Sequence, residues 1–202
     1  MPASDDRKLN KLLSEVRACR LCAGHIPEPR PVLVADSRAS ILVVGQAPGT
    51  RVHASGIPWN DASGKRLRQW LGVSDEEFYD ASLFAIVPMG FCYPGKGKSG
   101  DLPPRPECAP QWHDSVLALL PNIKCTLLIG QYAHAHYCAD SHKTLADRVN
   151  AWRGLVPSTY VMPHPSPRNT LWLKRNPVFE EKTVPHLRRT IRSILRSRNV
   201  AG

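Results

Sequence analysis

The sequence predicts an α/β fold in three layers, α/β/α, with a central four-stranded parallel sheet. Four continuous apolar runs carry this prediction, because strands covered on both faces do not alternate between apolar and polar residues. Helical patterns separate the runs, and strand alternating with helix is typical of a parallel sheet. A chain of 202 residues suits one domain, which we expect to span residues 1–202.

The expected elements follow one another in a regular order. Leucines and a valine recur at helical spacing in the first segment, which predicts an amphipathic helix over residues 4–18. The four strands are expected at residues 41–44, 83–87, 126–129 and 160–162. Longer helices are expected after Ser63-Gly64, from about residue 107 to 120, after Gly130, and from about residue 177 to 198. Ser74 and Glu77 form a capping-box pattern between the first two strands.

The charge balance narrows the class of partner. Lysine and arginine number 27 against 17 acidic residues, so the formal net charge is +10. Such an excess favours a polyanion, because neutralised phosphates release counterions on binding. No apolar run is long enough to span a bilayer, and residues 1–7 lack the apolar core of a secretory signal. We therefore expect a cytoplasmic protein that binds nucleic acid and has no membrane partner.

The six cysteines favour metal or redox chemistry over structural disulfides in such a chain. Cys19 and Cys22 form a C-x2-C pair beside the first helix, Cys92 follows the second expected strand, and Cys108 comes later. Four such thiolates can hold either a zinc ion or a 4Fe-4S cluster, and the residues alone leave both open. The remaining two cysteines are expected to be buried as small apolar side chains: Cys125 and Cys138.

Two loops after the first strand are candidates for a binding site. Gly45-Gln46-Ala47-Pro48-Gly49 follows the strand directly, and glycines there let backbone N–H groups approach a ligand. Trp59 stands in the next loop between a proline and a polar pair, which suits stacking on a base better than packing in a core. Asp61 lies near the start of a helix, where a carboxylate can cap the helix or act in catalysis.

A third loop follows the fourth strand and reads His164-Pro165-Ser166-Pro167-Arg168-Asn169. Two prolines stiffen this loop and remove backbone donors. His164 would therefore hold a fixed position at the carboxyl edge of the sheet, where open α/β sheets bind ligands. Arg168 stands at the loop tip, where it could contact phosphate or enter a duplex.

Taken in order, these motifs resemble the uracil-DNA glycosylase superfamily, particularly its iron–sulfur branches, families 4 and 5. The resemblance runs from about residue 8 to the last helix and implies a uracil-DNA glycosylase-like fold. It also favours a 4Fe-4S cluster over zinc. The matching segments are Gly45-Gln46-Ala47-Pro48-Gly49, Gly56-Ile57-Pro58-Trp59, Gly130-Gln131-Tyr132-Ala133 and His164-Pro165-Ser166-Pro167, and the implied cluster ligands are Cys19, Cys22, Cys92 and Cys108.

The resemblance implies a monofunctional DNA glycosylase that hydrolyses the N-glycosidic bond of uracil flipped out of DNA, in base excision repair. We expect a monomer. His164 would stabilise negative charge on the departing base, while Asp61, assisted by Gln46, would orient water and favour the sugar cation. Trp59 would stack on the base. Other substrate-binding candidates are Asn60, Gly45, Ala47, Met89 and Gly90, and the DNA-binding candidates are Lys65, Arg66, Arg168, Asn169 and Lys174.

The chain departs from the family pattern at four positions, one of which is the usual reader of the base. Gln46 stands where the Gly-Glu-Ala-Pro-Gly branch has Glu, and Ala47 where other branches have Asp or Asn. Trp59 replaces a commoner Phe, and Pro88 replaces the Asn expected to read uracil. Base reading could pass to Asn60, Gln46 or the backbone of residues 89–91.

These departures leave two alternatives open. One is a catalytically silent iron–sulfur protein that binds DNA or senses damage. The other is a glycosylase for another deaminated base, such as hypoxanthine. The loop from Tyr93 to Glu107 contains no His, which argues against the covalent trapping chemistry of a further branch.

Overall fold

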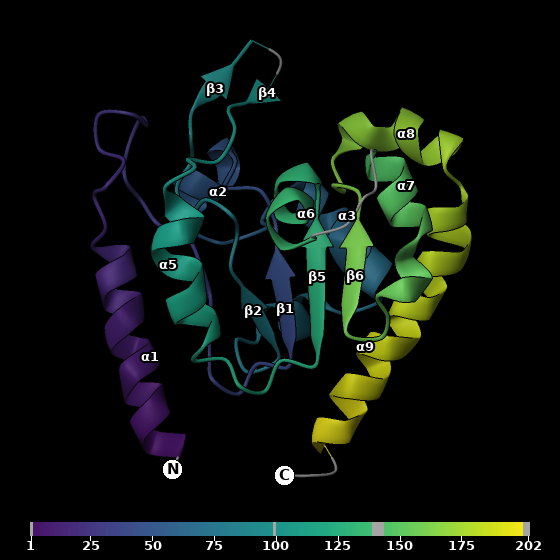
Figure 1. Ribbon diagram of the computed structural model, residues 1–202, viewed down its shortest axis with the longest axis horizontal. Helices are drawn as coiled ribbons and strands as arrows, with labels where there is room; N and C mark the ends of the chain where they lie inside the picture. The colour runs from purple at the N-terminus through teal and green to yellow at the C-terminus, as the bar shows by residue number, and fades with distance from the viewer. Residues whose placement is uncertain (1, 99, 139–143, 200–202) are drawn as a thin grey trace.

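A parallel sheet lies at the centre of the computed structural model, which describes residues 2–98, 100–138 and 144–199 (Figure 1). Its neighbouring strands are all parallel. In spatial order the strands are β2 (Phe84–Ile86), β1 (Ile41–Val44), β5 (Cys125–Ile129) and β6 (Thr159–Met162). The four apolar runs predicted as strands are confirmed, and so is the three-layer architecture.

The strand order creates a switch point between β1 and β5. After β1 the chain moves outward to β2, and it then returns to the other side of β1 to form β5 and β6. In open sheets, connections that leave in opposite directions open a crevice at the carboxyl ends of the two strands. The turns after β1 and β5 therefore face the same crevice.

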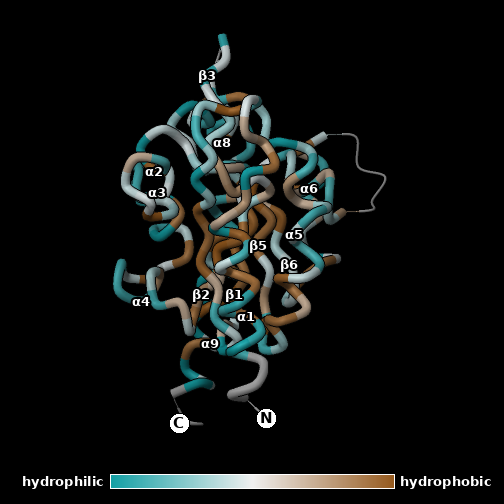
Figure 2. Tube along the Cα trace, turned by 90° about the vertical axis from the view of Figure 1, so that its left-hand side faces the viewer, coloured by the Kyte–Doolittle hydropathy of each residue, from teal (hydrophilic) through white to brown (hydrophobic). Residues whose placement is uncertain are grey.

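Helices cover both faces of the sheet, and Figure 2 shows α3 and α5 on opposite sides of it. On one side α1 packs on α5, and elsewhere α3 packs on α9. The strands are buried throughout because both faces are covered; Val43, Leu127 and Val161, for example, have no exposed surface. The helices are α1 (Pro2–Arg17), α2 (Thr50–Ser55), α3 (Ala62–Leu71), α4 (Asp75–Tyr79), α5 (Cys108–Leu117), α6 (Gln131–Tyr137), α7 (Leu145–Asn150), α8 (Thr170–Arg175) and α9 (Val184–Asn199).

The predicted capping box is present at the start of α4. The Ser74 hydroxyl accepts the Glu77 N–H at 3.2 Å, and the Glu77 carboxylate accepts the Ser74 N–H at 2.9 Å. These reciprocal bonds satisfy two backbone donors that the first turn of a helix leaves unpaired.

The basic C-terminal segment differs from the single helix predicted over residues 177–198. Helix α8 ends before Pro177, a π-helical turn spans Phe179–Thr183, and α9 follows. Two prolines explain the division. Pro177 disfavours helix at the residue before it, and Pro185 lacks the N–H that a regular helix would need at that point.

A two-stranded antiparallel hairpin, β3 (Lys96–Gly97) and β4 (Gly100–Asp101), was not predicted. It projects beyond the carboxyl edge of the central sheet (Figure 1). Strands of two residues carry no readable periodicity, so the sequence gives no sign of them. Across the described ranges, no helix is both long and apolar enough to cross a membrane.

Candidate active site

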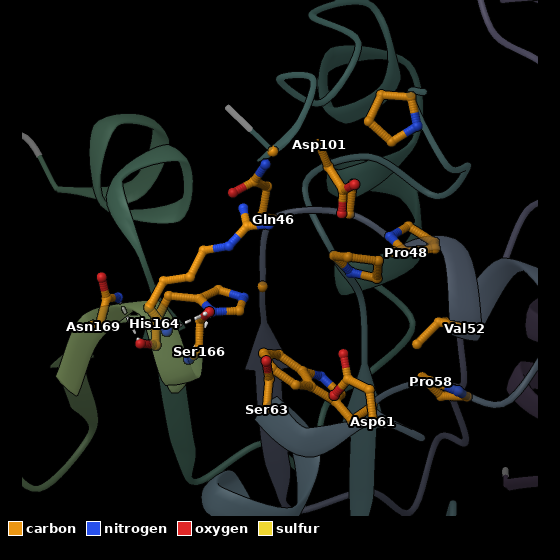
Figure 3. Close-up of a pocket in the computed structure, with 18 residues that line it drawn as sticks. Gln46, Pro48, Val52, Pro58, Asp61, Ser63, Asp101, His164, Ser166 and Asn169 are labelled. Atoms are coloured by element: carbon orange, nitrogen blue, oxygen red, sulfur yellow. Dashed lines mark hydrogen bonds between the residues drawn. The ribbon is translucent and has the colours of Figure 1, made fainter. Parts of the chain in front are cut away.

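A pocket of about 470 Å³ opens at the carboxyl edge of the sheet, at the switch point (Figure 3). Its walls come from segments far apart in sequence: the turn after β1, the loop before α3, the β3–β4 hairpin and the loop after β6. Of the predicted site residues, those lining the pocket are Gly45, Gln46, Ala47, Trp59, Asp61, His164, Arg168 and Asn169.

Trp59 is held in place by two glycines. Its φ of 57° lies in the left-handed region, which a bulky residue enters only under constraint. A Cβ on Gly64 would lie 1.7 Å from the Trp59 carbonyl oxygen, and a Cβ on Gly45 would lie 2.8 Å from the Trp59 ring. Arg68 also donates to the Trp59 carbonyl at 3.2 Å. The indole is therefore pressed against the backbone at the end of β1, on the wall of the pocket.

His164 is oriented by its own loop. Its Nδ1 accepts the Ser166 N–H at 3.2 Å, and the Asn169 side chain donates to the His164 carbonyl at 2.8 Å. Burial lowers the pKa of His164 below its ordinary value, although the nearby carboxylates of Asp61 and Asp101 act in the opposite direction. The ring is therefore neutral at pH 7 with its proton on Nε2, so that Nε2 is a hydrogen-bond donor.

The Trp59 and His164 rings lie in the same pocket with their centroids 5.5 Å apart and their planes inclined at 31°. A base between two rings needs ~7 Å, twice the carbon–carbon contact distance of ~3.5 Å. A base stacked on Trp59 would therefore lie beside His164, with its edge toward the imidazole, and not between the rings.

Asp61 combines the two roles considered for it. Its Oδ1 accepts the Gly64 N–H at 2.7 Å and caps the start of α3. The same side chain lines the pocket. Capping holds the carboxylate at the positive end of the helix, and one of its oxygens is already committed to the backbone.

The structure separates the three candidates for base reading. Gln46 lines the pocket, and its amide donates to the Leu102 carbonyl at 3.4 Å. Asn60 and the backbone of residues 89–90 lie outside the pocket wall. The Met89 N–H donates to the Gly45 carbonyl and the Gly90 N–H to the Gln46 carbonyl, both at 2.9 Å.

The position of the expected Asn also has no free backbone group. Pro88 has no N–H, and its carbonyl oxygen lies 3.0 Å from Nε2 of the buried His113. Donation from this imidazole requires the proton on Nε2, so its Nδ1 accepts the Tyr137 hydroxyl at 2.5 Å. The backbone of Pro88 therefore has no N–H to donate, and its carbonyl oxygen is occupied by His113.

The predicted DNA contacts have different surroundings. Arg168 and Asn169 lie on the pocket wall. Arg66 donates to the Ser166 carbonyl at 3.2 Å and so ties α3 to the histidine loop. Lys65 and Lys174 are exposed outside the pocket. Arg66 thus has a positioning role that the sequence did not indicate.

Asp101 is a pocket residue that sequence reasoning missed. It comes from β4, and its Oδ2 lies 3.3 Å from the place where a Cβ on Gly49 would stand. Figure 3 shows it entering from the hairpin side, with Asp61 on the helix side. Only the fold brings it near the turn after β1, so no local motif could identify it.

The four predicted ligand cysteines, Cys19, Cys22, Cys92 and Cys108, line a second pocket together. The Phe91 N–H donates to Cys108 Sγ at 3.3 Å. Burial, with a smaller contribution from neighbouring thiols, raises the pKa of Cys92 to about 11 and that of Cys108 to about 12. Without a cation these thiols would stay protonated, whereas a bound metal deprotonates its thiol ligands.

The four thiols share this pocket wall without forming a group that would hold a single metal ion. Within the described part of the chain, no three His, Cys, Asp or Glu side chains are grouped closely enough for one metal ion. Of the other two cysteines, Cys125 is buried in β5 as predicted, and Cys138 is half-buried at the end of α6.

The family model described as Uracil DNA glycosylase superfamily matches residues 31–188. The matched range contains the whole central sheet and every residue of the carboxyl-edge pocket. Cys19 and Cys22 precede it.

Gly64→Ala tests the packing that holds Trp59. The new Cβ would overlap the Trp59 carbonyl oxygen, so we expect the free energy of unfolding to fall by about 2 kcal/mol or more. Gly154→Ala is the matched control, because nothing lies within 4 Å of its added Cβ; its change should stay within about 0.5 kcal/mol. Urea unfolding measures both, and equal stabilities would contradict the packing described.

Proposed function

The chain belongs to the uracil-DNA glycosylase superfamily, a class of DNA-repair hydrolases that act on DNA, and we propose that it excises uracil flipped out of DNA. The observation that carries this proposal is the meeting of Trp59 and neutral His164 in one pocket at the carboxyl edge of the sheet. The cytoplasmic location, the monomeric state and the single domain over residues 1–202 stay predictions.

The pocket requires an extruded nucleotide. A base inside a duplex cannot reach enclosed side chains, and extrusion costs a few kcal/mol. The net charge of +10 favours the phosphate contacts that offset this cost. Exposed Lys65 and Lys174 and the pocket-lining Arg168 are the proposed contacts. Stacking on Trp59 contributes roughly 1 to 3 kcal/mol to holding the base.

His164 stabilises the leaving group. When the C1′–N1 bond breaks, its electron pair passes to the base, and negative charge develops on the base oxygens. The Nε2–H of His164 is available as a donor because Nδ1 is engaged by the Ser166 N–H. A fixed donor of this kind typically contributes about 3 kcal/mol to the transition state.

Asp61 supports the sugar side of the reaction. Its carboxylate lines the pocket and stabilises positive charge on the oxocarbenium-like sugar. The cap bond from the Gly64 N–H at 2.7 Å fixes its position, so little reorganisation is needed during the reaction. Its second oxygen can orient a water molecule toward C1′.

Gln46 is the proposed reader of the uracil edge. Its amide offers one acceptor and one donor side by side, which complements the N3–H and O4 of uracil. Of the competing candidates, the Met89 and Gly90 N–H groups bond to the turn after β1, and Asn60 lies outside the pocket wall. Gln46 would thus take over the base-reading role of the asparagine that is expected at position 88, where this chain has Pro88.

The second pocket is proposed to hold a 4Fe-4S cluster on Cys19, Cys22, Cys92 and Cys108. Four thiols around a largely apolar pocket suit a cluster of several irons, whose ligand sulfurs stand further apart than those around one zinc ion. When bound, the cluster would tie the segment after α1 to the loop after β2 and to the first residue of α5.

His164→Ala should slow single-turnover release of uracil on the order of 10²-fold or more, because the variant lacks the donor to the departing base. Alkaline cleavage of abasic sites in a uracil-containing oligonucleotide measures the rate. His136→Ala, on the exposed side of α6, is the matched control. A His164→Ala rate equal to wild type would remove this residue from the mechanism, and a panel with hypoxanthine would reveal another base preference.

The rate should also fall in acid. The pKa of His164 lies below its ordinary value of 6.5 because the ring is buried, so the ring is still mostly neutral at pH 6.5. When the ring is protonated at lower pH, Nδ1 can no longer accept the Ser166 N–H, and the loop loses its anchor. Rates measured from about pH 5 to 8 should be flat near neutrality and drop below about 6.5. A drop centred above that value would contradict the buried neutral ring.

Purified protein should contain about four irons per chain and show broad visible absorption. Cys92→Ser should lose both, because it removes one of the four ligands, whereas Cys138→Ser should keep both. Iron and sulfide analysis and a visible absorption spectrum of the wild type and both variants measure these properties. A colourless protein that contains zinc would contradict the cluster.

A further inference from the structure

The turn after β1 lacks a carboxylate. The turn reads Gly45-Gln46-Ala47-Pro48-Gly49, and none of these side chains can take a proton from water at neutral pH. Asp61 supplies negative charge, but its Oδ1 is held by the Gly64 N–H at 2.7 Å. The carboxylate of Asp61 is therefore tied to a helix start, and the turn itself carries no acid.

Asp101 brings a second carboxylate to this turn. Its Oδ2 lies 3.3 Å from where a Cβ on Gly49 would stand, two residues after Ala47. The side chain lines the pocket and stays exposed at its mouth. It forms neither a hydrogen bond nor an ion pair with the described residues, in contrast to Asp61.

The hairpin that carries Asp101 is anchored at the pocket. The Leu102 N–H donates to the Gly95 carbonyl at 2.9 Å, and the Leu102 carbonyl accepts from the Gln46 amide at 3.4 Å. On the opposite side, the Arg168 guanidinium packs against Gly100, whose added Cβ would lie 2.5 Å from Nη1. Contacts from both the β1 turn and the histidine loop thus hold Asp101 over the pocket.

We propose that Asp101 is a catalytic residue which supplies, from the hairpin, the carboxylate that the turn after β1 lacks. The inference rests on the proposed base excision. Water forms the new O–C1′ bond and gives its proton to the Asp101 carboxylate, while the C1′–N1 electron pair leaves with the base. The base anion accepts the hydrogen bond from His164 and is later protonated by solvent. Asp61 keeps its electrostatic role.

Single-turnover release of uracil by Asp101→Asn tests the proposal. The substitution keeps size and polarity but removes the proton acceptor, so the rate should fall about 10²-fold, with an unchanged melting temperature. Adding Ala47→Asp to this variant should restore part of the rate, because the acid returns to the neighbouring turn. Lys98→Gln changes charge on the same hairpin and should keep the wild-type rate at saturating enzyme. A rate for Asp101→Asn within about twofold of wild type would overturn the proposal.

A binding measurement tests the same carboxylate without turnover. Oligonucleotides carrying a cationic pyrrolidine or a neutral tetrahydrofuran in place of the sugar report how strongly the pocket favours positive charge. Wild-type protein should prefer the cation by about tenfold, and Asp101→Asn should lose much of that preference while Lys98→Gln keeps it. An unchanged preference in Asp101→Asn would overturn the proposal. If the wild-type protein releases no base but shows this Asp101-dependent preference, the proposed base excision is refuted and the role of the Asp101 carboxylate in binding a cation is kept.

Discussion

The close approach of Trp59 to two glycines is the constraint on which the pocket depends. The indole presses on Gly45 at the end of β1, and the Trp59 carbonyl fills the space beside Gly64 in the first turn of α3. These contacts fix the loop between the first strand and the helix, and with it the capping carboxylate of Asp61. A larger residue at either glycine would move the ring and the acid together.

A second set of contacts links the cysteine pocket to the active-site pocket. Cys108 begins α5 and accepts the Phe91 N–H. One turn further along this helix, His113 stacks on Phe91 and lies within hydrogen-bond distance of the Pro88 carbonyl. Pro88 itself lines the active-site pocket. The helix that starts at a candidate cluster ligand therefore positions one wall of the active-site pocket.

The sequence predicted the features that depend on local residue patterns. It did not predict contacts between residues that lie far apart in the sequence. Four apolar runs were enough for the sheet, and proline-stiffened or glycine-rich turns marked Trp59 and His164. The hairpin has strands too short for any periodicity, so Asp101 was invisible. The bond of Arg66 to the Ser166 carbonyl joins residues far apart in sequence, which no helical pattern reveals. The Met89 and Gly90 N–H groups likewise donate to carbonyls of the turn after β1, and only the folded arrangement of the two segments reveals these bonds.

The bond between the Phe91 N–H and Cys108 Sγ closes the base of the loop that carries the hairpin. Closing a loop costs only about 0.6 kcal/mol more for each doubling of its length. A change in the length of this segment therefore costs little chain entropy, while contacts with the β1 turn and the histidine loop constrain Gly100 and Leu102. Asp101 therefore lies on a part of the pocket wall whose length can change at little cost in chain entropy, while the sheet beneath it stays the same.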